Sequence, residues 1–138
     1  MVIDGVLETC LYAGDLEAAE RFYAGVLQLP VFARVAERHV FFRCGAGMLL
    51  VFDPQRTLSA PGEVGGISVP AHGASGAGHV CFRIDAEELG AWRTRLQRNG
   101  VAIEAEIAWP RGGSSLYVRD PAGNSVELAP ASIWTKSD

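Results

Sequence analysis

RHVFFRCGAGMLLVFD (residues 38–53) and SSLYVRDPAGNSVELA (residues 114–129) are two copies of one pattern, and this repeat decides the fold of the chain. Each copy predicts two apolar strands joined by a short turn that contains glycine. The aligned pairs are Arg43 with Arg119, Gly47 with Gly123, and Val51 with Glu127. The second copy therefore places a carboxylate where the first is apolar, and burying it is costly unless a positive group meets it.

A strand and a helix are predicted ahead of each copy. Residues 5–13 and 77–84 alternate apolar and polar side chains, which is typical of strands. Asp15 and Asp85 follow as the predicted N-caps of two amphipathic helices, and an acidic capping box supports the second. The two caps lie 85 − 15 = 70 residues apart, so the repeat extends over nearly the whole chain.

The predicted fold class is α+β, with two strand-helix-strand-strand-strand modules. The first module covers about residues 4–53 and the second about 77–130, and both belong to one domain, residues 1–138. Each module alone leaves one sheet face uncovered, so pairing the modules closes these faces around a cavity in a partly open barrel with the helices outside. Residues 54–76 are rich in Gly, Pro and Ser, and we expect this linker to be mostly loop.

The composition excludes several classes of partner. The net charge of −4 argues against nucleic acid and anionic membranes, which both need a concentrated basic face. No apolar run of about 18 residues is present to span a membrane, and the first residues do not resemble a signal peptide. A cytoplasmic location is therefore predicted. The three scattered cysteines are expected to be small buried residues without disulfides.

Three polar side chains interrupt predicted apolar strands. Glu8, His79 and Glu127 each lie opposite the apolar face of their strand, so all three are expected to point into the cavity. Two carboxylates and an imidazole suit one divalent metal ion of the Fe, Mn, Zn, Ni or Co type. The alternative is a buried ion pair of Glu8 or Glu127 with Arg83 or Arg119, which needs no metal.

Other side chains have simpler explanations. His39 is expected at the surface, and His72 is expected in a solvated part of the linker, with closure over the site as the alternative. Trp109 precedes a Pro- and Gly-containing loop that borders the pocket or forms a structural corner.

Three segments resemble the vicinal oxygen chelate superfamily, also called the glyoxalase/bleomycin resistance/dioxygenase superfamily. They are LETCLYAGDLEAAERFYAGVLQLPV (residues 7–31), GHVCFRI (residues 78–84) and SLYVRDPAGNSVEL (residues 115–128). The resemblance implies paired βαβββ modules, a metal at the module junction and a homodimer. Modules of this family pair within one chain or between two chains, and both arrangements stay open here.

The resemblance also implies roles for individual residues. His79 and Glu127 match ligand positions of metal-binding members, whereas Glu8 stands where His is common. Glyoxalase I has a fourth ligand, a Glu, where this chain has Val51, which disfavours that activity. Ser115 and Tyr117 match a Ser-x-Tyr motif of fosfomycin-inactivating transferases, but those enzymes have Thr at the position of Cys10, and the substrate stays open.

Two functions follow from the resemblance. The first is a metal-dependent lyase, thiol transferase, epimerase or dioxygenase that chelates two adjacent oxygens of a small oxygen-rich substrate. The second is a metal-free protein that binds a small molecule or antibiotic, like the bleomycin resistance proteins. For the enzyme, the candidate catalytic residues are Glu127, Tyr117 and Tyr12. The candidate substrate-binding residues are Cys10, Arg83, Trp109, Ser115 and Arg119.

Overall fold

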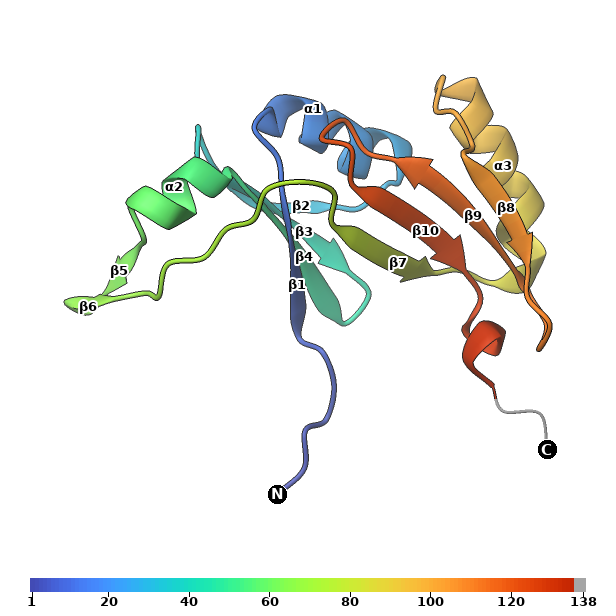
Figure 1. The fold of residues 1–138 in the computed structure, drawn as a ribbon, viewed down its shortest axis with the longest axis horizontal. Coiled ribbons are helices and arrows are strands. Elements are labelled where there is room, and N and C mark those ends of the chain that lie inside the picture. Colours follow the sequence, from blue (N-terminus) through green and yellow to red (C-terminus); the bar gives the residue numbers. More distant parts are fainter. Residues whose placement is uncertain (136–138) are drawn as a thin grey trace. The chain divides into compact units, whose positions relative to one another are not determined.

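The computed structural model describes residues 1–135 of the chain (Figure 1). The chain divides into two units, Met1–Gly76 and the part that begins at Ala77. Each unit contains a four-stranded mixed sheet and a helix against it, so the α+β class and the duplicated module are confirmed. No helix within residues 1–135 is long and apolar enough to cross a membrane.

The first unit builds its sheet from strands of five or six residues. Its elements are β1 (Glu8–Tyr12), α1 (Leu16–Glu20), the π-helical segment η1 (Arg21–Val26), β2 (Val31–Val35), β3 (His39–Cys44), β4 (Gly47–Phe52), α2 (Pro54–Ser59), β5 (Glu63–Val64) and β6 (Ile67–Ser68). The strand order is β1-β4-β3-β2, with β1 parallel to β4 and the other pairs antiparallel.

The second unit repeats this topology. Its elements are β7 (His79–Arg83), the 3₁₀ turn η2 (Ala86–Glu88), α3 (Leu89–Arg98), β8 (Ala105–Ala108), β9 (Ser114–Arg119), β10 (Ser125–Ala129) and the 3₁₀ turn η3 (Ala131–Trp134). The strand order β7-β10-β9-β8, with β7 parallel to β10, is the same as in the first unit.

The first helix begins as predicted and ends earlier than predicted. The side chain of Asp15 accepts a hydrogen bond from the Ala18 amide at 2.9 Å, which confirms the N-cap. The amide of Leu27 then bonds the carbonyl of Phe22, five residues back, as in a π-helix. Gln28 has a φ of 62°, in the left-handed region, so the helix stops before Pro30, where the sequence predicts its end.

The second helix begins later than predicted. The side chain of Asp85 makes no cap hydrogen bond, and a 3₁₀ turn separates this residue from the first residue of α3, Leu89. The predicted capping box is therefore wrong, although Asp85 still marks the start of the helical region. Leu96 in the last turn of α3 is fully buried, and α3 contacts β9.

One face of each sheet is apolar and packs on the helix of its own unit. In the first unit, the ring of Tyr23 in η1 lies 5.7 Å from that of Phe42, and α1 contacts β3 and β4. The buried strand residues are Val40, Phe42, Leu49 and Val51 in the first unit, and Val80, Leu116, Val118, Val126 and Leu128 in the second. The opposite faces carry the polar side chains that the alternation predicts, and in the first unit they also carry apolar ones such as Leu50 and Phe52.

The alignment of Glu127 with Val51 is wrong by one residue. In the parallel pairs, Glu127 lies across from Cys81, and the corresponding residue Cys10 lies across from Leu50. The cause is the hairpin turn, because the second turn is one residue longer than the first. The flanking paired residues are Arg43 and Met48 in the first hairpin, and Arg119 and Ser125 in the second. Leu50 is the true counterpart of Glu127 and is also apolar, so the conclusion that this position lacks a carboxylate stands.

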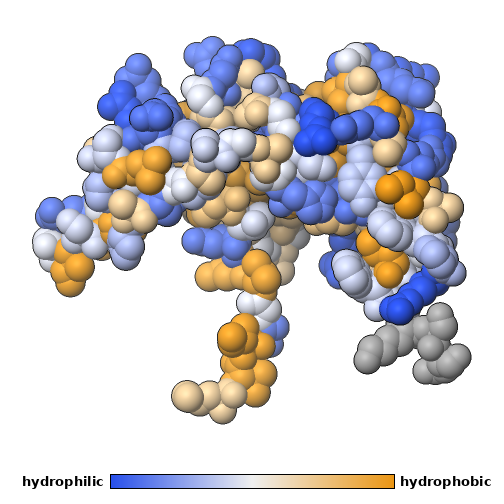
Figure 2. Space-filling model, in the orientation of Figure 1, coloured by the Kyte–Doolittle hydropathy of each residue, from blue (hydrophilic) through white to orange (hydrophobic). Residues whose placement is uncertain are grey.

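The linker is more ordered than predicted. Residues 54–76 contain α2, whose N-cap Asp53 accepts from the Gln55 amide at 2.9 Å, and the short β5–β6 hairpin. Pro54 at the first helical position favours α2, because its fixed φ suits a helix start. Ahead of β1, by contrast, residues 1–7 expose apolar side chains, which Figure 2 shows on the N-terminal segment.

The longer turn of the second hairpin is closed by a buried carboxylate. Oδ1 of Asp120 accepts from the amides of Ala122 and Asn124, both at 2.9 Å, and Oδ2 accepts from Nδ2 of Asn124 at 2.9 Å. Oδ1 of Asn124 accepts from the amide of Gly78 at 2.8 Å. Asp120 and Asn124 are almost fully buried, so this network links the β9–β10 turn to the start of β7.

Replacing this carboxylate is expected to be costly. Asp120→Ala leaves buried amide donors without an acceptor, so we expect the free energy of unfolding to fall by about 2–4 kcal/mol. Chemical denaturation measures the loss. The control is Asp15→Ala, which removes an exposed helix cap and is expected to cost about 1 kcal/mol. Equal losses in the two variants would contradict a special role for the turn.

Candidate functional site

Glu127 is a buried carboxylate at the centre of β10. It is 5% exposed, and its Oε1 accepts a hydrogen bond from the hydroxyl of Ser115 at 2.5 Å. The indole Nε1 of Trp109 donates to the same hydroxyl at 2.7 Å. Because Trp109 takes a lone pair of the Ser115 oxygen, the single hydroxyl proton is directed at Glu127. The sequence predicts Ser115 and Trp109 as substrate-binding residues, and the structure makes them supports of the carboxylate.

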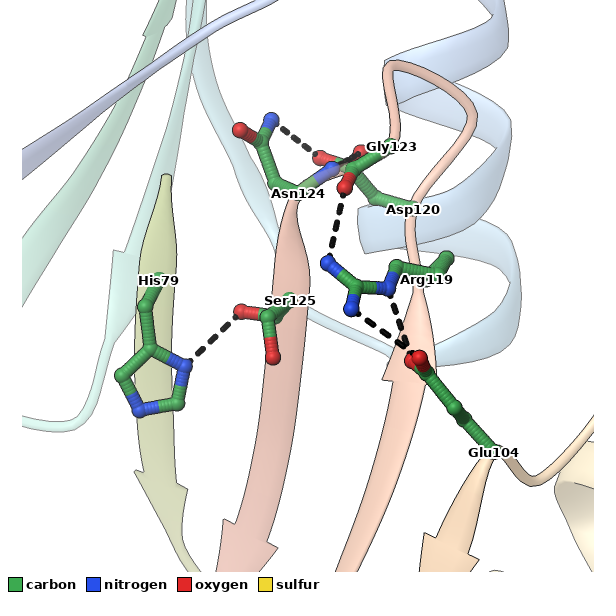
Figure 3. Close-up of polar contacts among 7 residues, drawn as sticks. All are labelled: His79, Glu104, Arg119, Asp120, Gly123, Asn124 and Ser125. Carbon is green, nitrogen blue, oxygen red and sulfur yellow. Dashed lines mark hydrogen bonds and ion pairs between the residues drawn. The ribbon is translucent and has the colours of Figure 1, made fainter. Parts of the chain in front are cut away.

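His79 at the start of β7 faces the other carboxylate oxygen. Its Nδ1 lies 3.1 Å from the backbone carbonyl oxygen of Ser125 (Figure 3). Because a carbonyl only accepts, Nδ1 carries the hydrogen, and in the neutral ring Nε2 keeps its lone pair. Nε2 lies 3.4 Å from Oε2 of Glu127.

The pair of Nε2 and Oε2 has the chemistry of a cation site. Two lone-pair atoms at this separation repel each other unless a proton or a metal ion lies between them. A divalent ion with bonds of about 2.1 Å keeps neighbouring ligand atoms about 3.0–3.4 Å apart, from octahedral to tetrahedral geometry. A metal-binding histidine is usually oriented by a hydrogen bond from its other ring nitrogen, as Nδ1 of His79 makes here to a backbone carbonyl. His79 and Glu127 therefore fit a divalent metal ion, and an ion pair with protonated His79 is the competing arrangement.

Tyr117 and Cys81 border the same carboxylate. Tyr117 pairs with Glu127 across the antiparallel strands, and Cys81 pairs with it across the parallel strands. Desolvation is the main reason why the pKa of Tyr117 rises to about 12. A hydrogen bond to Glu127 and the negative charge of Glu127 also raise it. Desolvation and then the charge and hydrogen bonding of Glu127 raise the pKa of Cys81 to about 12. Both groups are therefore protonated at neutral pH and act as donors.

Alkaline pH is expected to destabilise the fold through these two groups. Their ordinary pKa values are 9.0 for Cys and 10.0 for Tyr, so between about pH 9 and 12 the unfolded chain loses protons that the folded chain keeps. The free energy of unfolding therefore falls as the pH rises through this window. Denaturation at a series of pH values checks this, and Tyr117→Phe is expected to flatten the decline. An unchanged slope in that variant would contradict the assignment.

Arg119 does not pair with Glu127. Its guanidinium binds both carboxylate oxygens of Glu104, with Nε at 2.7 Å from Oε2, and donates to the carbonyl of Gly123 at 3.2 Å (Figure 3). No arginine within the described part of the second unit forms an ion pair with Glu127, so a buried Arg119–Glu127 pair is wrong. Arg83 ends β7 across from Ala129 and is exposed.

The remaining predicted site residues lie on β1 of the first unit. Glu8 and Cys10 are exposed on the face opposite Leu11, and the Tyr12 hydroxyl lies 2.7 Å from Nδ1 of His72. Burial, followed by the charge of Cys10, raises the pKa of Tyr12. Within either unit, residues 1–135 hold no group of three His, Cys, Asp or Glu side chains close enough for a metal. Metal binding by Glu8 therefore stays a prediction.

The cysteines differ in part from the prediction. All three are free, as expected, but Cys10 and Cys81 are exposed and only Cys44 is partly buried. Their strand positions place Cys10 and Cys81 on the polar sheet faces, opposite the helices.

Sequence reasoning missed the groups that orient His79. The Ser125 carbonyl holds its ring, and the Gly78 amide is bonded to the side chain of Asn124. A backbone acceptor leaves no trace in the sequence. Asp120 and Asn124 lie in the glycine-containing turn that the sequence predicts, but composition does not show that Asn124 bonds the residue ahead of β7.

The sequence matches the family model of the Glyoxalase/Bleomycin resistance protein/Dioxygenase superfamily over residues 5–128. The chain belongs to this superfamily, which confirms the resemblance drawn from its motifs. No curated protein matches the sequence.

Solved structures agree with this assignment. A lactoylglutathione lyase from Agrobacterium tumefaciens is 41% identical, with a TM-score of 0.88 over 99% of this chain and 100% of that one. A glyoxalase/bleomycin resistance protein/dioxygenase from Nocardioides is 21% identical, with a TM-score of 0.72 over 94% and 85% of the two chains. An integron cassette protein from the Halifax Harbour sewage metagenome is 20% identical, with a TM-score of 0.72 over 93% and 99%. The last two show likeness of fold alone.

Proposed function

We propose that this protein is a divalent-metal-dependent enzyme that chelates two adjacent oxygens of a small oxygen-rich substrate. The observation that carries the proposal is the pair of His79 Nε2 and Glu127 Oε2, which lie 3.4 Å apart with the other nitrogen of His79 held by a backbone carbonyl. Similarity to a lactoylglutathione lyase at 41% identity supports an enzyme.

His79 and Glu127 are the metal ligands in this proposal, and Glu8 is the sequence-predicted third ligand. One imidazole and two carboxylates suit Fe, Mn, Zn, Ni or Co. When bound, the metal supplies a Lewis acid that stabilises negative charge on a substrate oxygen.

The protein groups around Glu127 have separate tasks. Ser115 fixes Oε1 of Glu127, and Oε2, which lies 3.4 Å from Nε2 of His79, is the proposed ligand atom. Tyr117 keeps its proton at neutral pH and hydrogen-bonds Glu127, so it helps to hold the carboxylate in place. Arg83 and Cys10 remain the proposed substrate contacts, and Tyr12, whose hydroxyl lies 2.7 Å from Nδ1 of His72, remains a proposed catalytic residue. Arg119 is already engaged by Glu104.

Lactoylglutathione lyase activity is a second, narrower candidate. The 41% identity to the enzyme from Agrobacterium tumefaciens favours it. Leu50 at the counterpart of Glu127 opposes it, because the four-ligand pattern of glyoxalase I needs a carboxylate there. A spectrophotometric assay with the hemithioacetal of methylglyoxal and glutathione decides: turnover that depends on added metal supports this reaction, and its absence in metal-loaded protein excludes it.

The test of the main proposal is metal content. Protein purified without chelator is analysed for the five metals, and metal-stripped protein is titrated with each by calorimetry. We expect one ion per chain for at least one metal, with weaker binding in Glu8→Gln. If no metal binds, the enzyme proposal fails, and the metal-free binding protein remains.

A homodimer and a cytoplasmic location complete the proposal. The exposed apolar side chains of residues 1–7 support self-association, since a second copy can bury them. Light scattering after size-exclusion chromatography is expected to give twice the monomer mass of 14.7 kDa, and a monomer would contradict the dimer. The free cysteines are consistent with a reducing compartment.

A further inference from the structure

The first unit contains a pocket that the proposed metal ligands do not explain. Its volume is about 350 Å³, within the size range of small-molecule sites. Its lining comes from the β2–β3 turn, β3, β4, α2 and the linker, and it includes Arg38, His39, Phe41, Phe52, Thr57 and His72. The expectations that His39 is a surface residue and that His72 is solvated are both wrong, because the two side chains are partly buried in this pocket.

Four rings form the wall of the pocket. His39 stacks on Phe41 with centroids 4.0 Å apart and an interplanar angle of 9°. Phe52 meets Phe41 edge-on at 5.2 Å and His72 edge-on at 4.9 Å. Desolvation and the nearby Arg38 lower the pKa of His39, so its ring is a neutral wall. Rings in these orientations present flat apolar surface to a planar guest.

One polar atom in the wall of the pocket has no hydrogen-bond partner. Nδ1 of His39 is the buried side-chain polar atom in residues 1–135 that has no hydrogen-bond partner. Buried polar groups without partners are rare in folded proteins and call for an explanation. Because this nitrogen is itself buried, it offers no hydrogen bond to a molecule in the pocket.

Hydrogen bonds hold the linker over the pocket. The amide of Val69 donates to the Gly62 carbonyl at 2.7 Å, and the amide of His72 donates to the Thr57 carbonyl at 3.3 Å. The Tyr12 hydroxyl lies 2.7 Å from Nδ1 of His72, which ties the linker to β1. The pocket is therefore a built feature of the first unit, with its roof fixed on two sides.

The charge of the pocket favours an anionic ligand. Arg38 is its one permanently charged lining residue, and no carboxylate lines it. Nη1 of Arg38 donates to the Ala60 carbonyl at 2.8 Å, which leaves other guanidinium hydrogens for a ligand. The nearby acids have other partners, since Glu37 pairs with Arg56 at 3.4 Å and Asp53 caps α2.

We propose that this pocket binds a planar aromatic carboxylate, with its ring among Phe41, Phe52 and the two histidines and its carboxylate on Arg38. Arginine binds carboxylates through paired hydrogen bonds, and the rings exclude water from them. The proposal stands on the first unit alone and does not depend on metal binding by His79 and Glu127.

The experiment compares two matched compounds. 1-Naphthoate and the uncharged 1-naphthalenemethanol are titrated into metal-stripped protein by calorimetry, and naphthoate is expected to bind more tightly. Arg38→Gln is expected to weaken naphthoate about 10- to 100-fold and to leave naphthalenemethanol unchanged. Arg34→Gln is the control, because Arg34 pairs with Glu20 away from the pocket. Phe41→Leu is expected to weaken both compounds.

The outcomes separate this proposal from the proposed function. Equal naphthoate affinity in Arg38→Gln and Arg34→Gln, or no naphthoate binding by the unaltered chain, overturns it. Should Arg38→Gln fail to fold, Arg38→Lys keeps the charge and is expected to retain the preference for naphthoate over naphthalenemethanol, and loss of that preference counts against the proposal. Naphthoate affinity is expected to be the same in Glu127→Gln, whatever that variant does to metal binding.

Discussion

Glu127→Gln is expected to lower the affinity for a divalent metal by more than about 100-fold, beyond the effect of losing an outer hydrogen bond. The glutamine can still accept the Ser115 hydrogen bond through its amide oxygen. Its amide nitrogen then replaces Oε2, the atom 3.4 Å from Nε2 of His79, and removes the negative charge. The substitution thus keeps the shape of the site and removes one ligand. Calorimetry with metal-stripped protein measures the loss.

Two further measurements test whether Glu127 is a ligand: a control variant of another glutamate, and the pKa of Tyr117, which is measured without metal. Glu104→Gln removes an exposed carboxylate of the same unit that binds Arg119, and metal affinity is expected to stay unchanged. In Glu127→Gln the pKa of Tyr117 is expected to fall from about 12 toward its ordinary value, because two of its causes disappear while desolvation remains. Ultraviolet titration follows it. A variant with a lowered tyrosine pKa and full metal content would refute Glu127 as a ligand.

Ser115→Ala is expected to weaken metal binding by about 10- to 100-fold without changing a ligand. The hydroxyl is fully buried and donates to Oε1 of Glu127 at 2.5 Å, so its removal takes away one of the donors that hold the carboxylate in place. The indole of Trp109 loses its acceptor as well. Calorimetric titration with the metal that the unaltered chain binds measures the effect.

Variants of Trp109 test whether this residue positions the Ser115 hydroxyl or only packs against it. Trp109→Phe removes the indole donor and keeps an aromatic ring, and a smaller loss than in Ser115→Ala is expected because the hydroxyl can still reach Glu127. The double variant is expected to resemble Ser115→Ala, since Trp109 acts through that hydroxyl. The control Ser114→Ala changes the preceding residue of β9. Additive losses in the double variant would mean that Trp109 acts independently of Ser115.

The fold was predictable because its signal is periodic. Alternating side chains marked the strands, and a repeat of about 70 residues showed that one module occurs twice. The register was not predictable to the residue, because it depends on the turn. The turn after Arg119 contains one more residue than the turn after Arg43, so sequence matching placed Val51 where the strands place Leu50. Turn length sets register in hairpins, and composition alone does not reveal it.

The site was predictable in its residue types and less so in its connections. His79 and Glu127 were expected to meet, and they do so within one unit. Ser115 was expected to touch substrate, yet its hydroxyl is consumed by Trp109 and Glu127. The linker was expected to be loop because Gly, Pro and Ser dominate it. Its order comes from capping by Asp53 and from contacts with distant side chains such as Tyr12, which local composition does not encode.

The hydrogen bond from the Gly78 amide to the Asn124 side chain has a consequence for how this half of the molecule opens. The Gly78 amide joins the β9–β10 turn to the start of β7, which carries His79. If the turn opens, the start of β7 is therefore expected to open with it. Hydrogen exchange at Gly78 and at Ser125, whose amide bonds the Gly78 carbonyl, should then slow in concert when an ion is captured. Ordering of this part of the second unit and binding of the proposed metal ion would thus be coupled.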